Sequence, residues 1–284
     1  MAEQDATEQV TQVWEAVAPA WERHRRRLFE QVRPVSEWLV AQVEPEPGHT
    51  ILELGCGPGE TGFLAAERLG NDGKLISTDV SPSMVDVARR GSAERALTNV
   101  EHRVVDAQQM DLPDDSVDGV LSRFTFMLIP EPKRAFGEVH RVLRAGRPFA
   151  YAAWGSMDGN PWVTSIIAAI LQNGHAPPTG GAGPFEPGGL FSLAAPEPNT
   201  TYLESAGFSD VSTQEIIGAM EYPTFDEYWD TNTSVAGPLA QMLETLSDDQ
   251  VMAIRDAAQQ MVEPHRVEST YKFPYTVMAV RARA

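Results

Sequence analysis

Hydrophobic positions recur along the chain in two alternating patterns. Short apolar runs predict strands at residues 49–54, 74–79, 100–105, 117–122 and 147–154. Stretches with helical spacing lie between them, at residues 60–69, 82–90 and 132–144. Strands that alternate with helices at this spacing are typical of βαβ units. The pattern therefore predicts a doubly wound α/β domain whose mainly parallel sheet is covered on both faces.

A helical pattern precedes this domain. Apolar residues at helical spacing over residues 7–43 predict two helices that are separated at Pro34. The Pro- and Gly-containing segment 44–48 then breaks the helical pattern. We expect residues 1–46 to form an N-terminal helical cap segment and residues 47–284 to form the α/β domain.

The alternation stops after residue 154. Residues 174–199 are rich in Gly and Pro, and a loop of this length inside a compact domain is typical of a lid over a site. The remaining elements are predicted as a helix at 202–206, a strand at 211–217, a helical stretch at about 224–262 and a last strand at 273–280. We therefore expect two insertions in the domain, at about 155–200 and 219–268.

Composition narrows the class of protein. Hydrophobic residues make up 42% of the 284 residues and charged residues 22%, as in ordinary globular proteins. The formal net charge of −18 argues against a nucleic-acid partner, because phosphate binding needs clustered Lys and Arg. The one basic run, residues 23–27, is interpreted as a solvated helix face, with an anion or partner site as the alternative.

Cysteine content and hydropathy bear on location. Cys56 is the single cysteine, so an intramolecular disulfide and a thiolate metal cluster are excluded. The N-terminus lacks the apolar core of a signal peptide, and the longest apolar stretch, at 162–171, is too short to span a bilayer. We expect a cytoplasmic protein without a membrane span, either a monomer or a homodimer.

Two glycine patterns overlap where the first strand is expected to meet the first helix of the domain. One runs Glu-x-Gly-x-Gly-x-Gly from Glu53 to Gly59, and the other runs Gly-x-Gly-x-x-Gly from Gly57 to Gly62. Glycines at such a turn let the backbone approach a ligand, which holds for a dinucleotide pyrophosphate and for the tail of S-adenosylmethionine. The glycines alone leave both cofactors open.

Acidic residues at the ends of the first three strands favour one of the two cofactors. Glu53 can orient the loop or meet a cationic ammonium group, but it is unfavourable beside a pyrophosphate. Asp79 ends the second strand, where a carboxylate can accept ribose hydroxyls from either cofactor. Asp106 follows the third strand and can accept the exocyclic amine of an adenine at that edge of the sheet. The set favours S-adenosylmethionine.

The segment from about residue 47 to 155 resembles the class I S-adenosylmethionine-dependent methyltransferases, particularly those of ubiquinone and menaquinone biosynthesis. The resemblance rests on five motifs, which are Glu-Leu-Gly-Cys-Gly-Pro-Gly at 53–59, Asp-Val-Ser at 79–81 with Met84, Asp-Ala at 106–107, Val-Asp-Gly-Val at 117–120 and Arg-Val-Leu-Arg at 141–144. It implies a Rossmann-like, seven-stranded sheet in the order 3-2-1-4-5-7-6 with the seventh strand antiparallel. The last strand at 273–280 fits that role.

The resemblance also implies roles for individual residues. Glu53 and three glycines, Gly55, Gly57 and Gly59, would lie at the methionine part of the cofactor, and Asp79 at its ribose. The remaining cofactor-binding residues would be Val80 and Met84 at the adenine faces, Asp106 and Ala107 at its edge, and Ser122 and Arg123 on the far side. Met84 has an alternative interpretation as a helix residue that packs on the sheet.

The acceptor of the methyl group is less well defined by the sequence. His24 and His175 are candidate general bases, His265 is a weaker candidate, and His140 is interpreted as structural. Aromatic residues either line an apolar acceptor pocket or pack the cap onto the core, and these are Trp14, Trp21, Trp154, Trp162, Tyr228 and Trp229. The expected spacing of metal ligands is missing, so a metal site is not predicted.

We therefore predict methyl transfer from S-adenosylmethionine, with S-adenosylhomocysteine as product, to O, N or C of a small and fairly apolar molecule. Two alternatives remain open. One is a non-catalytic module that binds S-adenosylmethionine, and the other is an NAD(P)-dependent oxidoreductase that uses the Gly-x-Gly-x-x-Gly pattern.

Overall fold

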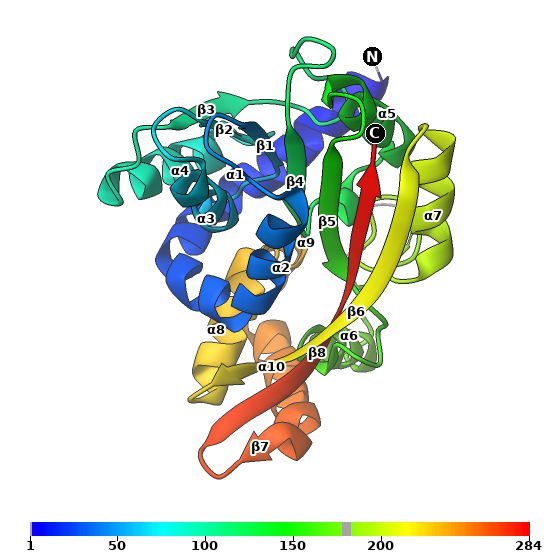
Figure 1. Cartoon of the computed structure of the whole chain (residues 1–284). Helices are drawn as coiled ribbons and strands as arrows, with labels where there is room; N and C mark the ends of the chain where they lie inside the picture. Colours follow the sequence, from blue (N-terminus) through cyan, green and yellow to red (C-terminus); the bar gives the residue numbers. More distant parts are fainter. Residues whose placement is uncertain (1, 178–182) are drawn as a thin grey trace.

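The apolar runs form the strands of one mixed sheet in the order β3-β2-β1-β4-β5-β8-β6 (Figure 1). The computed structural model describes residues 2–177 and 183–284. The strands are β1 (Thr50–Leu54), β2 (Lys74–Asp79), β3 (Val100–Val104), β4 (Gly119–Arg123), β5 (Pro148–Trp154), β6 (Ser209–Tyr222), β7 (Arg266–Val267) and β8 (Thr270–Arg283). The bounds of the first five strands differ from the predicted ones by at most two residues.

The predicted strand order is confirmed, because β8 is antiparallel to both β5 and β6 and occupies the place of the expected seventh strand. The expected count of seven is one too low. β7 is a two-residue strand that turns back onto the start of β8, and so short a strand leaves no periodic signal in the sequence.

Helices cover both faces of the sheet (Figure 1). They are α1 (Ala2–Gln31), α2 (Arg33–Val43), α3 (Glu60–Leu69), α4 (Pro82–Glu94), α5 (Pro132–Val142), α6 (Pro161–Gln172), α7 (Pro196–Ser205), α8 (Phe225–Val235), α9 (Gly237–Glu244) and α10 (Asp248–Val262), with short 3-10 helices at Phe126–Leu128 and Glu263–His265. α2 contacts α3 and α3 contacts α4, while α5 contacts α7. The reversal of strand order between β1 and β4 puts these two groups of helices on opposite faces.

The predicted N-terminal helices are confirmed, with the break at residue 32, two residues before Pro34. A proline early in a helix is favourable because its missing N–H would have no helical partner. α1 lies across two parts of the molecule, since it contacts α3 and α4 of the α/β domain as well as α8 and α9 of the second insertion.

The last two long strands extend further than predicted. β6 and β8 are each 14 residues long and pair from Ser209 with Arg283 to Tyr222 with Tyr271. The part of this pair near Tyr222 and Tyr271 forms a two-stranded arm that extends beyond the other strands (Figure 1), and α6 and α8 pack against β8 and β6. β6 therefore ends at Tyr222, three residues after the expected start of the second insertion at about residue 219.

The first insertion contains α6 and a series of turns that lead into α7. The proposed lid at 174–199 lies partly outside the described residues, because residues 178–182 are not described. The predicted helix at 202–206 is the end of α7, which begins earlier at Pro196. No helix in the described part of the chain is both long and apolar enough to cross a membrane.

Candidate active site

The turn between β1 and α3 has a backbone conformation that glycine adopts more readily than other residues. Gly55, Gly57 and Gly59 have φ values of +65°, +50° and +86°, in the left-handed region that other residues rarely adopt. A Cβ atom at Gly55 would lie 2.0 Å from Oγ1 of Thr125, and one at Gly59 would lie 2.4 Å from the Phe63 ring. At Gly57 a Cβ would meet no described atom within 4 Å. Gly57 therefore faces open space, whereas the other two glycines are needed for packing.

Glu53 holds this turn from beneath. Its side chain is buried, with one carboxylate oxygen accepting the Gly62 N–H at 2.7 Å and the other accepting the Ser77 hydroxyl at 2.9 Å. Burial raises the pKa of Glu53 to about 8. Of the two roles expected for Glu53, orientation of the loop is the one that its contacts support, because both oxygens already have partners inside the protein.

Asp79 connects the ends of β1 and β2. Its carboxylate accepts the Gly57 N–H at 2.9 Å and the Ser81 N–H at 3.0 Å. Burial raises the pKa of Asp79, although both hydrogen bonds act in the opposite direction. The side chain is 9% exposed, beside the open space at Gly57, and Val80 next to it is partly exposed. These two residues occupy the edge of the sheet where the sequence places them.

The third strand end lies beside the second. The Val105 N–H donates to the Asp79 carbonyl at 3.0 Å, and the partly exposed Asp106 and Ala107 follow directly. One oxygen of Asp106 accepts the Gln108 backbone N–H at 2.8 Å. The carboxyl ends of β1, β2 and β3 thus bring three acidic residues of the sequence analysis to one edge of the sheet.

Met84 lies in a small cluster under α1, with Val17 and Ala18 as its buried neighbours and Trp14 and Trp21 packed around them. The hydrophobic neighbours of Met84 in this cluster come from α1 and α9 rather than from the strands, and its alternative interpretation as a residue that packs on the sheet stays a prediction. Its expected contact with an adenine face stays a prediction.

Ser122 and Arg123 at the end of β4 differ in what they offer a ligand. Ser122 is fully buried, and its hydroxyl donates to the Leu54 carbonyl at 2.8 Å, so the side chain joins β4 to β1. Nη1 of Arg123 is buried without a hydrogen-bond partner among the residues that the structure describes. Burial lowers the pKa of Arg123 to about 10, while the nearby Glu53 and Glu60 raise it. An unsatisfied guanidinium nitrogen suits an anionic group such as a carboxylate.

Two residues that the sequence analysis missed follow Arg123. Phe124 has a φ of +61°, and its ring stacks on Trp154 at 3.9 Å between centroids. A bulky residue in this conformation is strained, and such strain gathers at functional sites. Thr125 donates its hydroxyl to the Gly55 carbonyl at 3.3 Å, so this turn connects the glycine loop to the aromatic pair. Their place directly after a predicted strand end was the available signal.

The other predicted aromatic residues are divided between the two interpretations. Trp162 contacts Trp154 at 4.8 Å and extends the aromatic group beside Phe124. Tyr228 is fully buried and donates to the Trp162 carbonyl at 2.6 Å, which is packing of the cap on the core. Trp21 likewise bonds α1 to α8 through the Val235 carbonyl at 2.9 Å.

The candidate bases are not brought together with these residues. His24 lies on α1 with Nε2 3.3 Å from the Asp230 carboxylate, and burial lowers its pKa. His175 follows α6, where its backbone N–H bonds to Ile170. The ring of His265 packs on Phe273, and burial lowers its pKa as well. His140 packs edge-on against Phe208, as its structural interpretation predicts. The catalytic role of the first three stays a prediction.

The basic run of α1 is not the solvated face that we expected. Arg25 forms an ion pair with Glu94 of α4, and Arg27 forms one with Glu227 of α8 at 2.5 Å. Arg26, at 83% side-chain exposure, does face solvent. Ion pairs between residues so far apart in the sequence cannot be foreseen from local charge. In the described part of the chain, no group of His, Cys, Asp and Glu could hold a metal ion.

Comparison with known proteins agrees with this geometry. Residues 45–171 match the family described as "Methyltransferase domain". Aklanonic acid methyltransferase DauC of Streptomyces sp. (strain C5) is 29% identical over 54% of this chain and 68% of its own length. A demethylmenaquinone methyltransferase of Symbiobacterium thermophilum is 30% identical over 45% of this chain and 58% of its own. An arsenite methyltransferase of Halobacterium salinarum is 41% identical over 35% of this chain, but only 26% of its own length is matched.

Solved structures show the same fold. The [4+2]-cyclase SpnF aligns with a TM-score of 0.61 at 18% identity, covering 98% of this chain and 96% of that one. A SAM-dependent methyltransferase from Aquifex aeolicus aligns with a TM-score of 0.50 at 22% identity, covering 69% and 91%. The common fold includes the edge of the sheet where Gly57, Asp79, Asp106 and Arg123 lie.

Proposed function

Because the chain belongs to the class I S-adenosylmethionine-dependent methyltransferases, we propose that it transfers a methyl group from S-adenosylmethionine to a small, fairly apolar molecule. The acceptor atom is O, N or C. The observation that carries the proposal is the convergence of Gly57, Asp79 and Asp106 at the carboxyl ends of β1, β2 and β3, beside a backbone that leaves space for a ligand.

The residues at this edge fit the cofactor in chemistry. Asp79 would accept the ribose hydroxyls, and Asp106 would accept the exocyclic amine of adenine. The unpartnered Nη1 of Arg123 suits the carboxylate of the methionine part. Gly57 leaves room for that part to approach the backbone. When bound, S-adenosylmethionine supplies a methyl group on a sulfonium, whose displacement leaves a neutral thioether.

Alignment and exclusion of water are the tasks left to the protein in such a transfer, and a base is needed only for some acceptors. The aromatic group of Phe124, Trp154 and Trp162 stands next to the glycine loop through Thr125. Such a wall would bury an apolar acceptor beside the cofactor and hold it for in-line attack. Two of the relatives are named for small-molecule acceptors, aklanonic acid and demethylmenaquinone.

A second candidate is a protein that binds the cofactor without transferring its methyl group. It is favoured by one observation, the similarity of the whole fold to a protein described as a [4+2]-cyclase. Product detection separates the two candidates, since only a methyltransferase converts S-adenosylmethionine to S-adenosylhomocysteine as an acceptor gains a methyl group.

The first experiment is a thermal shift assay with S-adenosylmethionine, S-adenosylhomocysteine and NAD at equal concentration. A ligand that binds only the folded state raises the melting temperature, by an amount that corresponds to about 2.7 kcal/mol at a hundredfold excess over Kd. We expect a rise with the first two ligands alone. A rise with NAD alone would contradict the proposal and favour an oxidoreductase.

The second experiment incubates the protein with S-adenosylmethionine labelled in the methyl group and a panel of quinone, phenol and polyketide acceptors. Labelled product by mass spectrometry is the expected result. An Asp79→Asn variant serves as control, because it should lower product formation with every acceptor in the panel.

A further inference from the structure

The start of the Arg-Val-Leu-Arg motif on α5 is not used by the proposed reaction, yet it makes an unusual set of contacts. Arg141 donates from Nη2 to the Met110 carbonyl at 3.0 Å and from Nη1 to the Leu112 carbonyl at 2.7 Å. Glu138, one turn earlier, accepts the Met110 N–H at 2.7 Å. Two side chains of one helix therefore hold both backbone groups of Met110.

The two side chains also hold each other. Arg141 Nε donates to one oxygen of Glu138 at 2.7 Å, and Nη2 donates to the other at 2.8 Å. The hydrogen bond from Arg141 is the main reason that the pKa of Glu138 is lowered, and the same partner raises the pKa of Arg141. A bidentate ion pair of this kind is well oriented, because the planar guanidinium matches the carboxylate.

The ion pair of Glu138 and Arg141 contacts the loop that carries the predicted adenine-binding residues. Asp106 lies four residues before Met110, and its carboxylate is held by the backbone N–H of Gln108 at 2.8 Å. Gln108 also accepts the N–H of Glu131, next to the start of α5, at 3.0 Å. The short segment from Asp106 to Met110 is thus bonded at its middle, through Gln108, to the residue before α5, and at its end, through Met110, to α5 itself.

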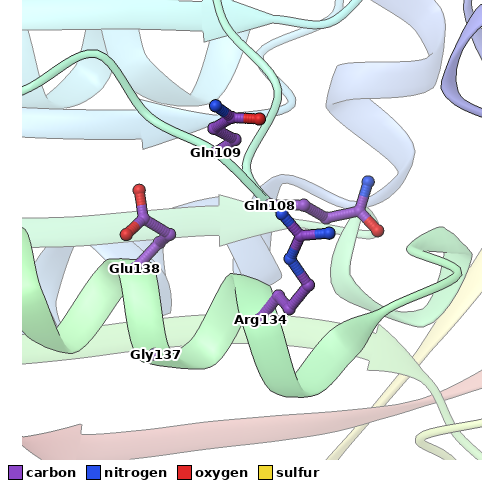
Figure 2. A pocket seen from close by; sticks show the side chains of 5 residues that line it. All are labelled: Gln108, Gln109, Arg134, Gly137 and Glu138. Carbon is purple, nitrogen blue, oxygen red and sulfur yellow. The ribbon is translucent and has the colours of Figure 1, made fainter. Parts of the chain in front are cut away.

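The loop and α5 meet around a hollow of about 400 Å³. Figure 2 shows Glu138 and Arg134 rising from α5 toward the loop that carries Gln108 and Gln109. Hydrogen bonds to Glu138 and Arg141 hold the Met110 backbone beside this hollow. The Met110 side chain itself is buried in the main core, so the loop has an apolar anchor that does not depend on Glu138.

We propose that Glu138 and Arg141 are positioning residues that fix the backbone of residues 106–110 so that the Asp106 carboxylate reads the exocyclic amine of adenine. This inference rests on the proposed function, because it assumes the cofactor at this edge of the sheet. Neither residue touches the cofactor in this arrangement. Their effect is on selectivity for the base rather than on the overall fold.

The test compares two ligands by calorimetry, S-adenosylhomocysteine and its inosyl analogue, in which an oxygen replaces the exocyclic amine. The wild type should prefer the adenosyl ligand. In Glu138→Ala the preference should fall about tenfold, the ratio that corresponds to about 1.4 kcal/mol. Glu138→Gln keeps an oxygen acceptor for the Met110 N–H and should retain part of the preference.

Glu101→Ala is the matched control. Glu101 also accepts hydrogen bonds from two cations, Lys74 at 3.1 Å and Arg103 at 2.5 Å, but it lies near the start of β3, away from the loop. A comparable ion-pair carboxylate is removed, and the preference between the two ligands should stay as in the wild type.

A double-mutant cycle separates positioning from general stability. Asp106→Asn should lower the preference by itself, and adding Glu138→Ala should then change it little, because the two residues act through the same contact. Additive losses would overturn the inference, as would a Glu138→Ala protein with the wild-type preference. Absence of S-adenosylhomocysteine binding by the wild type would overturn the proposed function as well, so the two failures are distinguishable.

Discussion

Gly57→Ala tests whether the open space at the glycine loop is the ligand site. In the ligand-free protein the substitution has two opposing effects. An alanine at φ +50° costs about 1–2 kcal/mol in the left-handed region, and the lower entropy of the unfolded chain offsets about 0.4–1 kcal/mol. The added methyl group meets no described atom within 4 Å, so a clash does not add to the cost. We expect a net loss of about 1 kcal/mol, or roughly 2–4 °C in melting temperature.

When the ligand is bound, the methyl group added by Gly57→Ala would occupy space that the ligand also needs. Overpacking a filled site costs about 1–3 kcal/mol, which corresponds to a Kd for S-adenosylhomocysteine that is about 5- to 150-fold higher. Titration calorimetry measures this ratio directly. The rise in Kd should therefore be larger than the small loss of folding stability alone would cause.

Gly48→Ala is the control for this experiment. Gly48 has a φ of +86°, and a methyl group added there would meet no described atom within 4 Å, but it lies in the turn before β1, at the opposite end of the sheet. Its substitution should lower the melting temperature by a similar amount and leave the Kd unchanged. Equal Kd values for Gly57→Ala and the wild type would refute the placement of the ligand at Gly57.

Three further predictions concern other parts of the site. Asp79→Ala should weaken S-adenosylhomocysteine binding by about 1.5–3 kcal/mol, the scale of hydrogen bonds to a charged group, and unchanged affinity by calorimetry would refute the ribose role. Because the pKa of Glu53 is raised from 4.5 to about 8, folding favours its protonated form, so its contribution to stability is lost as pH rises through this window. Urea unfolding at pH 5 and pH 8 should show a smaller decrease for Glu53→Gln than for the wild type, and equal decreases would contradict the raised pKa. Trp21→Phe removes the hydrogen bond to Val235 and should lower the unfolding free energy by about 0.5–1.5 kcal/mol, whereas no change would mean that water replaces the bond.

The sheet could be predicted because its information is local. The helix from Glu60 to Leu69 and the strand from Lys74 to Asp79 have the predicted bounds, since an apolar run and its flanking turn residues lie within a few positions of each other. The length of β6 could not be predicted in the same way. This edge strand is exposed over much of its length, and its pairing with β8 depends on residues 49 to 74 positions away.

The candidate site likewise contains residues that local sequence indicates and residues that depend on distant contacts. Gly57, Asp79 and Asp106 could be proposed from the sequence because each lies at or just after the end of a predicted strand, and parallel strands bring their carboxyl ends to one edge. The strained turn at Phe124 was missed, because no residue type marks it and a positive φ at a bulky residue is visible only in the structure. Local sequence order therefore suffices to propose cofactor-binding residues, whereas residues that depend on tertiary contacts escape it.

The contacts of α1 show why the residues that bind the methyl acceptor are difficult to predict from the sequence. Glu22 of α1 forms an ion pair with Arg90 of α4, with both hydrogen bonds at 2.8 Å. α1 also covers Met84, which lies on α4. On its other side it bonds to α8 through Trp21 and Arg27. One helix thus contacts both α4, which carries Met84, and the helices of the second insertion. We therefore expect substitutions in the N-terminal segment to affect the binding of both cofactor and acceptor, and they should be assayed for both ligands.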